Sequence, residues 1–185
     1  MGASGDARGL RARSVTVGYG KDAPILEDLS LDVLQGQLTV IVGPNACGKS
    51  TLLRSLARVL GVRSGVVELD GRALTTMNQK ELARRLGLLA QSSTAPADIL
   101  VEDLVARGRY PHQSILRQWS AEDDEAVAWA MRQAGVEALA RRRVGELSGG
   151  QRQRVWIAMV LAQSTDIVLL DEPTTYLDLN HQLEV

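Results

Sequence analysis

Short apolar runs broken by glycine and proline occupy the first half of the chain, a pattern typical of strands joined by turns. Gln35-Gly36 and Asp70-Gly71 predict two of these turns, because glycine adopts turn conformations without steric cost. We therefore predict strands at residues 14–17, 25–33, 38–42, 66–69 and 86–90.

Other segments predict helices, and one of them has apolar residues that recur every three to four positions. Residues 49–60 show this clearly, with apolar side chains at positions 52, 53, 56, 59 and 60. Ser120 and Asp123 fit a capping box at the start of another helix. We predict helices over residues 49–60, 78–85, 101–107, 120–134, 136–143 and 148–163.

The order of these elements predicts an α/β fold. Strands alternate with helices, which favours a mainly parallel core sheet, while residues 92–147 are expected to form an inserted helical subdomain. The four apolar residues 167–170 predict a core strand buried on both faces. Residues 1–13 carry arginines and small residues without an apolar segment, so we expect a flexible tail followed by one domain over residues 14–185.

Composition narrows the possible functions. With 185 residues and 45% hydrophobic content, the chain can bury a core. The net charge of −1 gives no reason to expect a nucleic-acid partner or an anionic lipid surface. A single cysteine cannot form an internal disulfide. The longest apolar runs, 155–162 and 167–170, are far below the roughly 20 residues that span a bilayer, so a membrane role needs a protein partner.

Residues 43–50 match the phosphate-loop pattern G-x-x-x-x-G-K-[ST], between a predicted strand and a predicted helix. Its glycines let backbone N–H groups curl around phosphate, and the helix N-terminus adds partial positive charge. Lys49 is expected to reach the β and γ phosphates and Ser50 to bind Mg²⁺. The residues predicted to bind the nucleotide here are Gly43, Pro44, Asn45, Ala46, Cys47, Gly48, Lys49, Ser50 and Thr51.

A second possible anion site lies at the N-terminus of the helix predicted at residues 148–163. Ser148 followed by two glycines offers a hydroxyl, exposed N–H groups and a helix dipole to an anion. The alternative is that Ser148 is an ordinary helix cap. We predict that the nucleotide site includes Ser148, Gly149, Gly150 and Gln151.

The phosphate loop, the LSGGQ sequence at 147–151 and the acidic strand end Asp171-Glu172 together resemble the ATP-binding cassette (ABC) family, whose ATPase subunits drive transport across membranes. The resemblance implies a P-loop NTPase core with an N-terminal antiparallel β subdomain, and ATP and Mg²⁺ as ligands. It also implies a head-to-tail homodimer, because in this family LSGGQ closes on the γ phosphate held by the other subunit.

The same resemblance implies roles for further residues. Asp171 is expected to bind Mg²⁺ with Ser50, and Glu172 to polarise the attacking water. Gln91 fits the Q-loop, which approaches Mg²⁺, and Tyr19 fits the aromatic residue that stacks on adenine. Residues 174–178 resemble the D-loop at the dimer interface. The predicted catalytic residues are Glu172, Lys49 and Gln91, and the predicted metal ligands are Ser50, Gln91 and Asp171.

Two further stretches, residues 108–112 (GRYPH) and 171–185 (DEPTTYLDLNHQLEV), are similar to ATPase subunits that import iron chelates, siderophores, haem or cobalamin. This implies permease partners, an indirect link to a substrate-binding protein and a place at the cytoplasmic face of the membrane. Another ABC importer or an exporter shares every catalytic motif and stays open. Members that act in DNA repair, chromosome folding or ribosome rescue carry long coiled coils or two cassettes, which do not occur in these 185 residues.

The family's switch histidine lies downstream of the D-loop, and neither His112 nor His181 occupies that position. We therefore expect a C-terminally truncated chain that lacks the last strands of the core, exposes apolar surface and hydrolyses ATP poorly by itself. A noncatalytic nucleotide-binding fragment is the alternative. The presence of Lys49, Asp171 and Glu172 argues against a decayed site.

Overall fold

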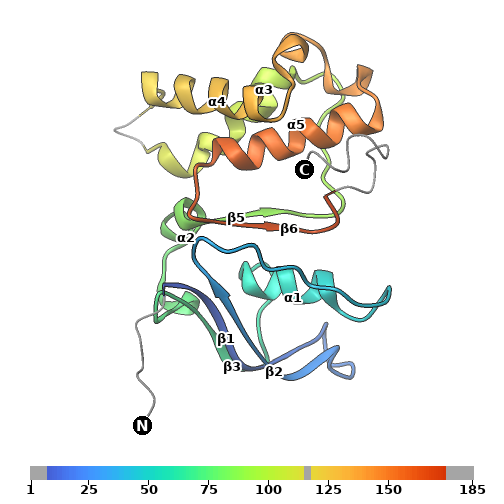
Figure 1. Ribbon diagram of the computed structural model, residues 1–185, viewed down its shortest axis with the longest axis vertical. Helices are drawn as coiled ribbons and strands as arrows, with labels where there is room; N and C mark the ends of the chain where they lie inside the picture. Colours follow the sequence, from blue (N-terminus) through green and yellow to red (C-terminus); the bar gives the residue numbers. More distant parts are fainter. Residues whose placement is uncertain (1–7, 115–117, 174–185) are drawn as a thin grey trace. The chain divides into compact units, whose positions relative to one another are not determined.

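The computed structural model describes residues 8–114 and 118–173, which form parts of two compact units (Figure 1). The first unit ends at Leu82 and the second begins at Ala83. Within the described ranges, no helix has both the length and the apolar character needed to cross a membrane.

The first unit contains an antiparallel sheet in the order β2-β1-β3-β4. Its central strand, β1, buries Leu10, Ala12, Val15 and Val17 completely, and a register shift between Ala12 and Val15 keeps these side chains on the inner face. The antiparallel N-terminal sheet expected from the family resemblance is confirmed. The strands are β1 (Gly9–Val17), β2 (Leu26–Leu34), β3 (Ser64–Leu69) and β4 (Arg72–Ala73).

The flexible tail predicted for residues 1–13 is wrong from Gly9 onward, where β1 begins. Leu10 and Ala12 pair with β2 on one side and with β3 on the other, so both their backbone and their side chains are held. The backbone N–H of Gly9 also donates to Asp70 Oδ1 at 2.8 Å. Residues 1–7 lie outside the described ranges.

The strand predicted at residues 38–42 is also wrong, because these residues pair with no strand of the described chain. Leu38 and Val42 are 91% and 88% exposed. A strand exists only through hydrogen bonds to a neighbouring strand, which an apolar run alone cannot supply. The exposed apolar surface that the sequence predicts is present here.

Helix α1 (Lys49–Leu56) follows the phosphate loop directly and buries Leu52 and Leu56. It is shorter than the predicted helix at 49–60, because Arg58 adopts a left-handed φ of 56° that turns the chain away. The Arg58 guanidinium then donates to the carbonyls of Leu74 and Met77. Beyond it lie η1 (Leu74–Thr76) and α2 (Gln79–Arg85).

The second unit pairs two parallel strands, β5 (Leu86–Leu89) and β6 (Ile167–Leu170). The parallel core pairing predicted from the sequence is confirmed, but the burial of β6 on both faces is wrong. Val168 and Leu170 are 38% and 36% exposed, and β5 is the only strand of the described chain that pairs with β6.

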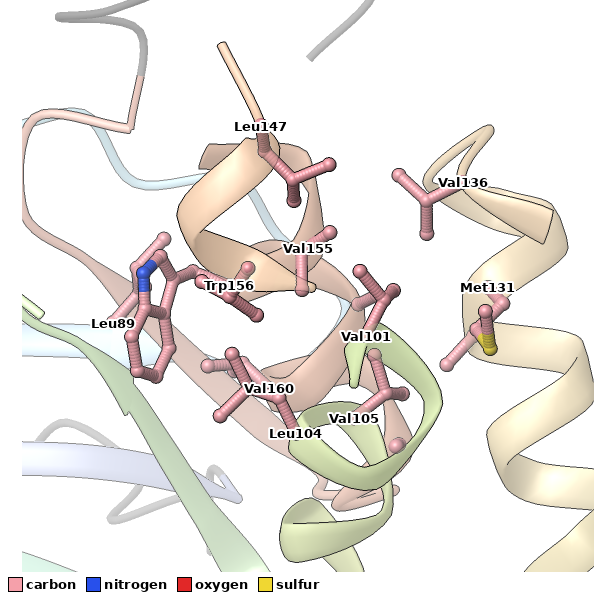
Figure 2. Close-up of a cluster of buried hydrophobic side chains, with 14 residues drawn as sticks. Leu89, Val101, Leu104, Val105, Met131, Val136, Leu147, Val155, Trp156 and Val160 are labelled. Atoms are coloured by element: carbon pink, nitrogen blue, oxygen red, sulfur yellow. The ribbon is translucent and has the colours of Figure 1, made fainter. Parts of the chain in front are cut away.

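Helices α3, α4 and α5 pack around one apolar cluster in this unit (Figure 2). Val101 and Val105 of α3 meet Val155 of α5, and Met131 of α4 borders the same cluster. The cluster also contains Leu89, so the helices share their core with β5. The helical elements are α3 (Val101–Ala106), η2 (Arg107–His112), α4 (Ala121–Gln133), η3 (Glu137–Leu139), η4 (Val144–Glu146) and α5 (Gly149–Ala162).

Candidate functional site

The phosphate loop closes on itself through Lys49. Its Nζ donates to the carbonyl oxygens of Gly43 at 2.9 Å and Pro44 at 2.8 Å, which places the ammonium group at the start of the loop. Gly48 has a φ of 96°, and a Cβ there would lie 2.9 Å from Leu26 Cδ2, so only glycine fits. The loop therefore brings a cation and the N-terminus of α1 together, as phosphate binding requires.

Tyr19 is hydrogen-bonded to α1, the helix that follows the phosphate loop. Arg54 Nη1 donates to Tyr19 Oη at 3.2 Å. Hydrogen bonds with the Thr51 side chain and with Arg54 hold the pKa of Tyr19 below its usual value. Tyr19 remains 42% exposed, so an aromatic residue is accessible in the same unit as the phosphate loop.

Arg63 organises the loop that carries Tyr19, a role that the sequence analysis missed. Its Nη1 donates to the carbonyl of Asp22 at 2.7 Å, and its Nη2 donates to the carbonyls of Tyr19 at 3.1 Å and Gly20 at 3.2 Å. No motif includes Arg63. Gly18 is the only local signal, because a Cβ at that position would lie 2.8 Å from the guanidinium.

Ser148 caps the N-terminus of α5. Its Oγ accepts a hydrogen bond from the Gln151 N–H at 3.2 Å, and its own N–H donates to Gln151 Oε1 at 3.1 Å. This capping box shows that Ser148 caps the helix, as the alternative interpretation held. Gly149 and Gly150 belong to the first turn, whose N–H groups have no carbonyl partner within a helix. The turn can therefore cap a helix and still offer donors to an anion.

The structure brings Gln91, Asp171 and Glu172 together at the carboxyl ends of β5 and β6. Gln91 Nε2 donates to Glu172 Oε2 at 2.6 Å. Asp171 is 3% exposed, and its N–H donates to the Leu89 carbonyl at 2.9 Å, which extends the ladder by one bond. Parallel strands end at the same edge of a sheet, so residues far apart in sequence meet here.

These residues fit a small hard cation bound beside phosphate. Mg²⁺ prefers oxygen ligands and usually takes one or two carboxylates, with substrate phosphates and water completing its shell. Asp171 offers a buried carboxylate, and Gln91 can offer an amide oxygen. The described residues contain no group of three or more histidine, cysteine or acidic side chains that could hold a metal ion without phosphate and water as further ligands.

The predicted site residues are thus divided between the two units. Tyr19 and the phosphate loop lie in the first unit, whereas Gln91, the Ser148 turn and Asp171-Glu172 lie in the second. The predicted D-loop at 174–178 and His181 lie outside the described residues.

Comparison with known proteins decides the family. Residues 26–175 match a family model described as ABC transporter. The chain belongs to the ABC transporter family. This confirms the predicted family and, with it, the α/β P-loop fold of its ATPase domain.

Two bacterial transport ATP-binding proteins are similar to the chain over most of its length. The ABC chain is 54% identical over 176 residues to the ferric enterobactin transport ATP-binding protein FepC of Escherichia coli, covering 95% of the chain and 65% of the relative. It is 53% identical to the probable siderophore transport system ATP-binding protein YusV of Bacillus subtilis, covering 95% and 64%. The chain therefore spans slightly less than two thirds of the length of these relatives.

Solved structures agree with the fold. A bacterial Atm1-family ABC exporter with ATP bound is 30% identical, with a TM-score of 0.81, over 96% of this chain and 31% of that one. A nucleotide-free ATP-binding cassette from an ABC transporter is 26% identical, with a TM-score of 0.75, over 90% and 69%.

Proposed function

We propose that this ABC chain binds and hydrolyses ATP to energise an importer for ferric siderophores or related metal chelates. The observation that supports this best is the meeting of Gln91, buried Asp171 and Glu172 at one sheet edge, in a chain that also carries the Lys49 loop. A protein that only bound nucleotide would not need a glutamate held beside a buried metal-binding carboxylate.

Each residue has a chemical task in this proposal. Lys49 stabilises charge on the β and γ phosphates, and Ser50 and Asp171 are the proposed oxygen ligands of Mg²⁺. When bound, Mg²⁺ supplies further neutralisation of phosphate charge. Glu172 orients and polarises the attacking water, and the Gln91 amide, 2.6 Å away, fixes the direction of that carboxylate.

We further propose that two copies assemble head to tail, with the Ser148 turn of one copy facing the ATP of the other. The first-turn N–H groups of Gly149 and Gly150 and the α5 dipole suit a γ phosphate. Permease subunits would hold this dimer at the cytoplasmic face of the membrane. A substrate-binding protein would be an indirect partner.

The transported substrate is proposed from the relatives, whose names refer to ferric enterobactin, a siderophore and petrobactin. The GRYPH sequence at 108–112 supports the same branch. The permease and the binding protein would select the chelate.

Reconstitution with the cognate permease in vesicles tests this function. Lys49→Ala should abolish ATP-driven uptake of a ferric siderophore, whereas Lys21→Ala, at an exposed lysine outside the loop, should leave uptake unchanged. Uptake that is insensitive to Lys49→Ala contradicts the energising role. ATP-driven uptake of another substrate but of no metal chelate contradicts only the substrate.

A further inference from the structure

Three residues of the GRYPH sequence in η2, namely Gly108, Arg109 and His112, contact the C-terminal end of α5, although the proposed chemistry uses none of them. Gly108 allows the closest approach, since a Cβ there would lie 2.2 Å from the Met159 carbonyl oxygen and 3.2 Å from Ala162 Cβ. Any other residue would push η2 away from α5.

Two side chains of η2 bind carbonyl groups at the C-terminus of α5. Arg109 Nη1 donates to the Ala162 carbonyl at 2.8 Å and to Ser164 Oγ at 3.1 Å. His112 Nε2 lies 2.8 Å from the Gln163 carbonyl, which can only accept, so Nε2 carries the proton. The last carbonyls of a helix have no partner within it and form the negative end of its dipole, so these donors stabilise the end of α5.

Arg109 also connects α5 to α4. Its Nε donates to Asp123 Oδ1 at 2.8 Å, and the two side chains are only 6% and 1% exposed. Asp123 Oδ2 accepts from the N–H and hydroxyl of Ser120, which begins α4. Burial alone would raise the pKa of Asp123, but the hydrogen bonds from Arg109 and Ser120 outweigh it and keep that pKa below its usual value.

The same end of α5 is connected to β5. Gln163 Nε2 donates to the carbonyl of Ala83, in the last turn of α2, and to that of Leu86, the first residue of β5. Arg84 Nε donates to the Pro111 carbonyl of η2 at 2.8 Å. One network therefore links η2, the C-terminus of α5 and the strand that leads to Gln91.

We propose that Arg109 and His112 are positioning residues that clamp the C-terminal end of α5 to β5 and α4. The clamp fixes the direction of α5, and hence the place of Ser148 at its other end. It also fixes the position of α5 relative to β5, the strand that precedes Gln91. The effect on turnover rests on the proposed function, in which Ser148 serves the ATP of a second subunit.

Hydrogen exchange of the protein, followed by mass spectrometry, tests the clamp without any nucleotide. His112→Leu removes the donor, whereas the matched variant His112→Gln keeps an amide donor at similar reach. His112→Leu should speed exchange at least about fivefold in residues 160–165 and 86–89, while residues 9–17 of the first unit stay unchanged. His112→Gln should stay close to the wild type. Equal exchange in both variants and the wild type overturns the clamp.

A second variant tests Arg109 without leaving Asp123 as an unpaired buried charge. The double change Arg109→Met with Asp123→Leu replaces the ion pair with apolar groups of similar size, which usually preserves folding. It also removes the Ala162 contact, so exchange at residues 160–165 should again rise.

ATPase measurements with the permease then separate positioning from folding. His112→Leu should lower kcat about tenfold and leave the Kd of ATP within about twofold, because the phosphate loop is in the other unit. Faster exchange with unchanged kcat overturns the positioning role. A wild-type protein that shows no ATPase activity even when it is assembled with the permease contradicts the proposed function, and hydrogen exchange still decides the clamp.

Discussion

The Arg63 guanidinium donates to the Tyr19 carbonyl at 3.1 Å, across 44 positions of sequence. The same group bonds Gly20 and Asp22, so a single side chain holds three carbonyls of the loop. Arg54 meanwhile holds the Tyr19 hydroxyl from α1. The position of the predicted adenine-stacking ring thus depends on two arginines that belong to no motif.

Arg63→Met should raise the Kd of ATP about tenfold, because the loop loses its charge-assisted hydrogen bonds. The Kd of inorganic tripolyphosphate should not change, since that ligand has no base. Isothermal titration calorimetry with both ligands measures the difference, and Lys21→Met in the same loop is the control. A parallel loss of affinity for both ligands would show a general folding defect instead.

Tyr19 should contribute to ATP binding through its ring rather than through its hydroxyl. Tyr19→Ala should weaken ATP binding by about 1–3 kcal/mol, the usual value of one base stacked on an aromatic side chain. Tyr19→Phe keeps the ring and should stay within about threefold of the wild type. Equal affinities of the alanine variant and the wild type in an ATP titration would rule out stacking.

Glu172→Gln should lower ATP turnover by about 10²–10⁴-fold, as expected for loss of a general base. ATP affinity should change little, because the phosphate loop is intact. Steady-state phosphate release by the dimer with its permease measures the effect, with Glu137→Gln on η3 as an exposed control. Gln91→Leu should lower ATP turnover less than Glu172→Gln does, because it removes only the 2.6 Å hydrogen bond to Glu172.

Alkylation of Cys47 should block nucleotide binding, and ATP should protect it. Cys47 is exposed, and its Sγ lies 4.0 Å from Lys49 Nζ within the loop. It is the single cysteine of the chain, so labelling with a maleimide reports on this position alone. Mass spectrometry of labelling rates gives the answer, and equal rates with and without Mg²⁺-ATP contradict the prediction.

The Arg109–Asp123 pair should make the free energy of unfolding depend on pH under acidic conditions. The pKa of Asp123 is lowered in the folded state, so its contribution is complete above the unfolded value, about 3.9. This contribution to stability is lost as the pH falls from there through the lower pKa that Asp123 has in the folded state. Below about pH 4, the thermal midpoint of the wild type should therefore fall more steeply with falling pH than that of the double variant with Arg109→Met and Asp123→Leu. Between pH 7 and about pH 4 this pair should add no difference in slope. Parallel curves below about pH 4 would contradict the prediction.

Local sequence by itself determined the parts of this protein that depend on neighbouring residues. The phosphate loop, the Ser148 turn and the Ser120–Asp123 capping box each use residues within a few positions, so their spacing is visible in the chain. The same holds for the apolar periodicity that predicted α1. Family membership followed because such short motifs carry the chemistry of nucleotide binding.

Only the tertiary structure decided features that need a distant partner. Residues 9–13 form part of a strand because they pair with β2 and β3, whereas residues 38–42 pair with no strand within the described chain. Gln91 meets Glu172 across 81 positions, and Arg109 reaches Ala162 across 53. Hydrogen bonds and burial depend on which atoms fold into contact, and a local pattern does not contain that information.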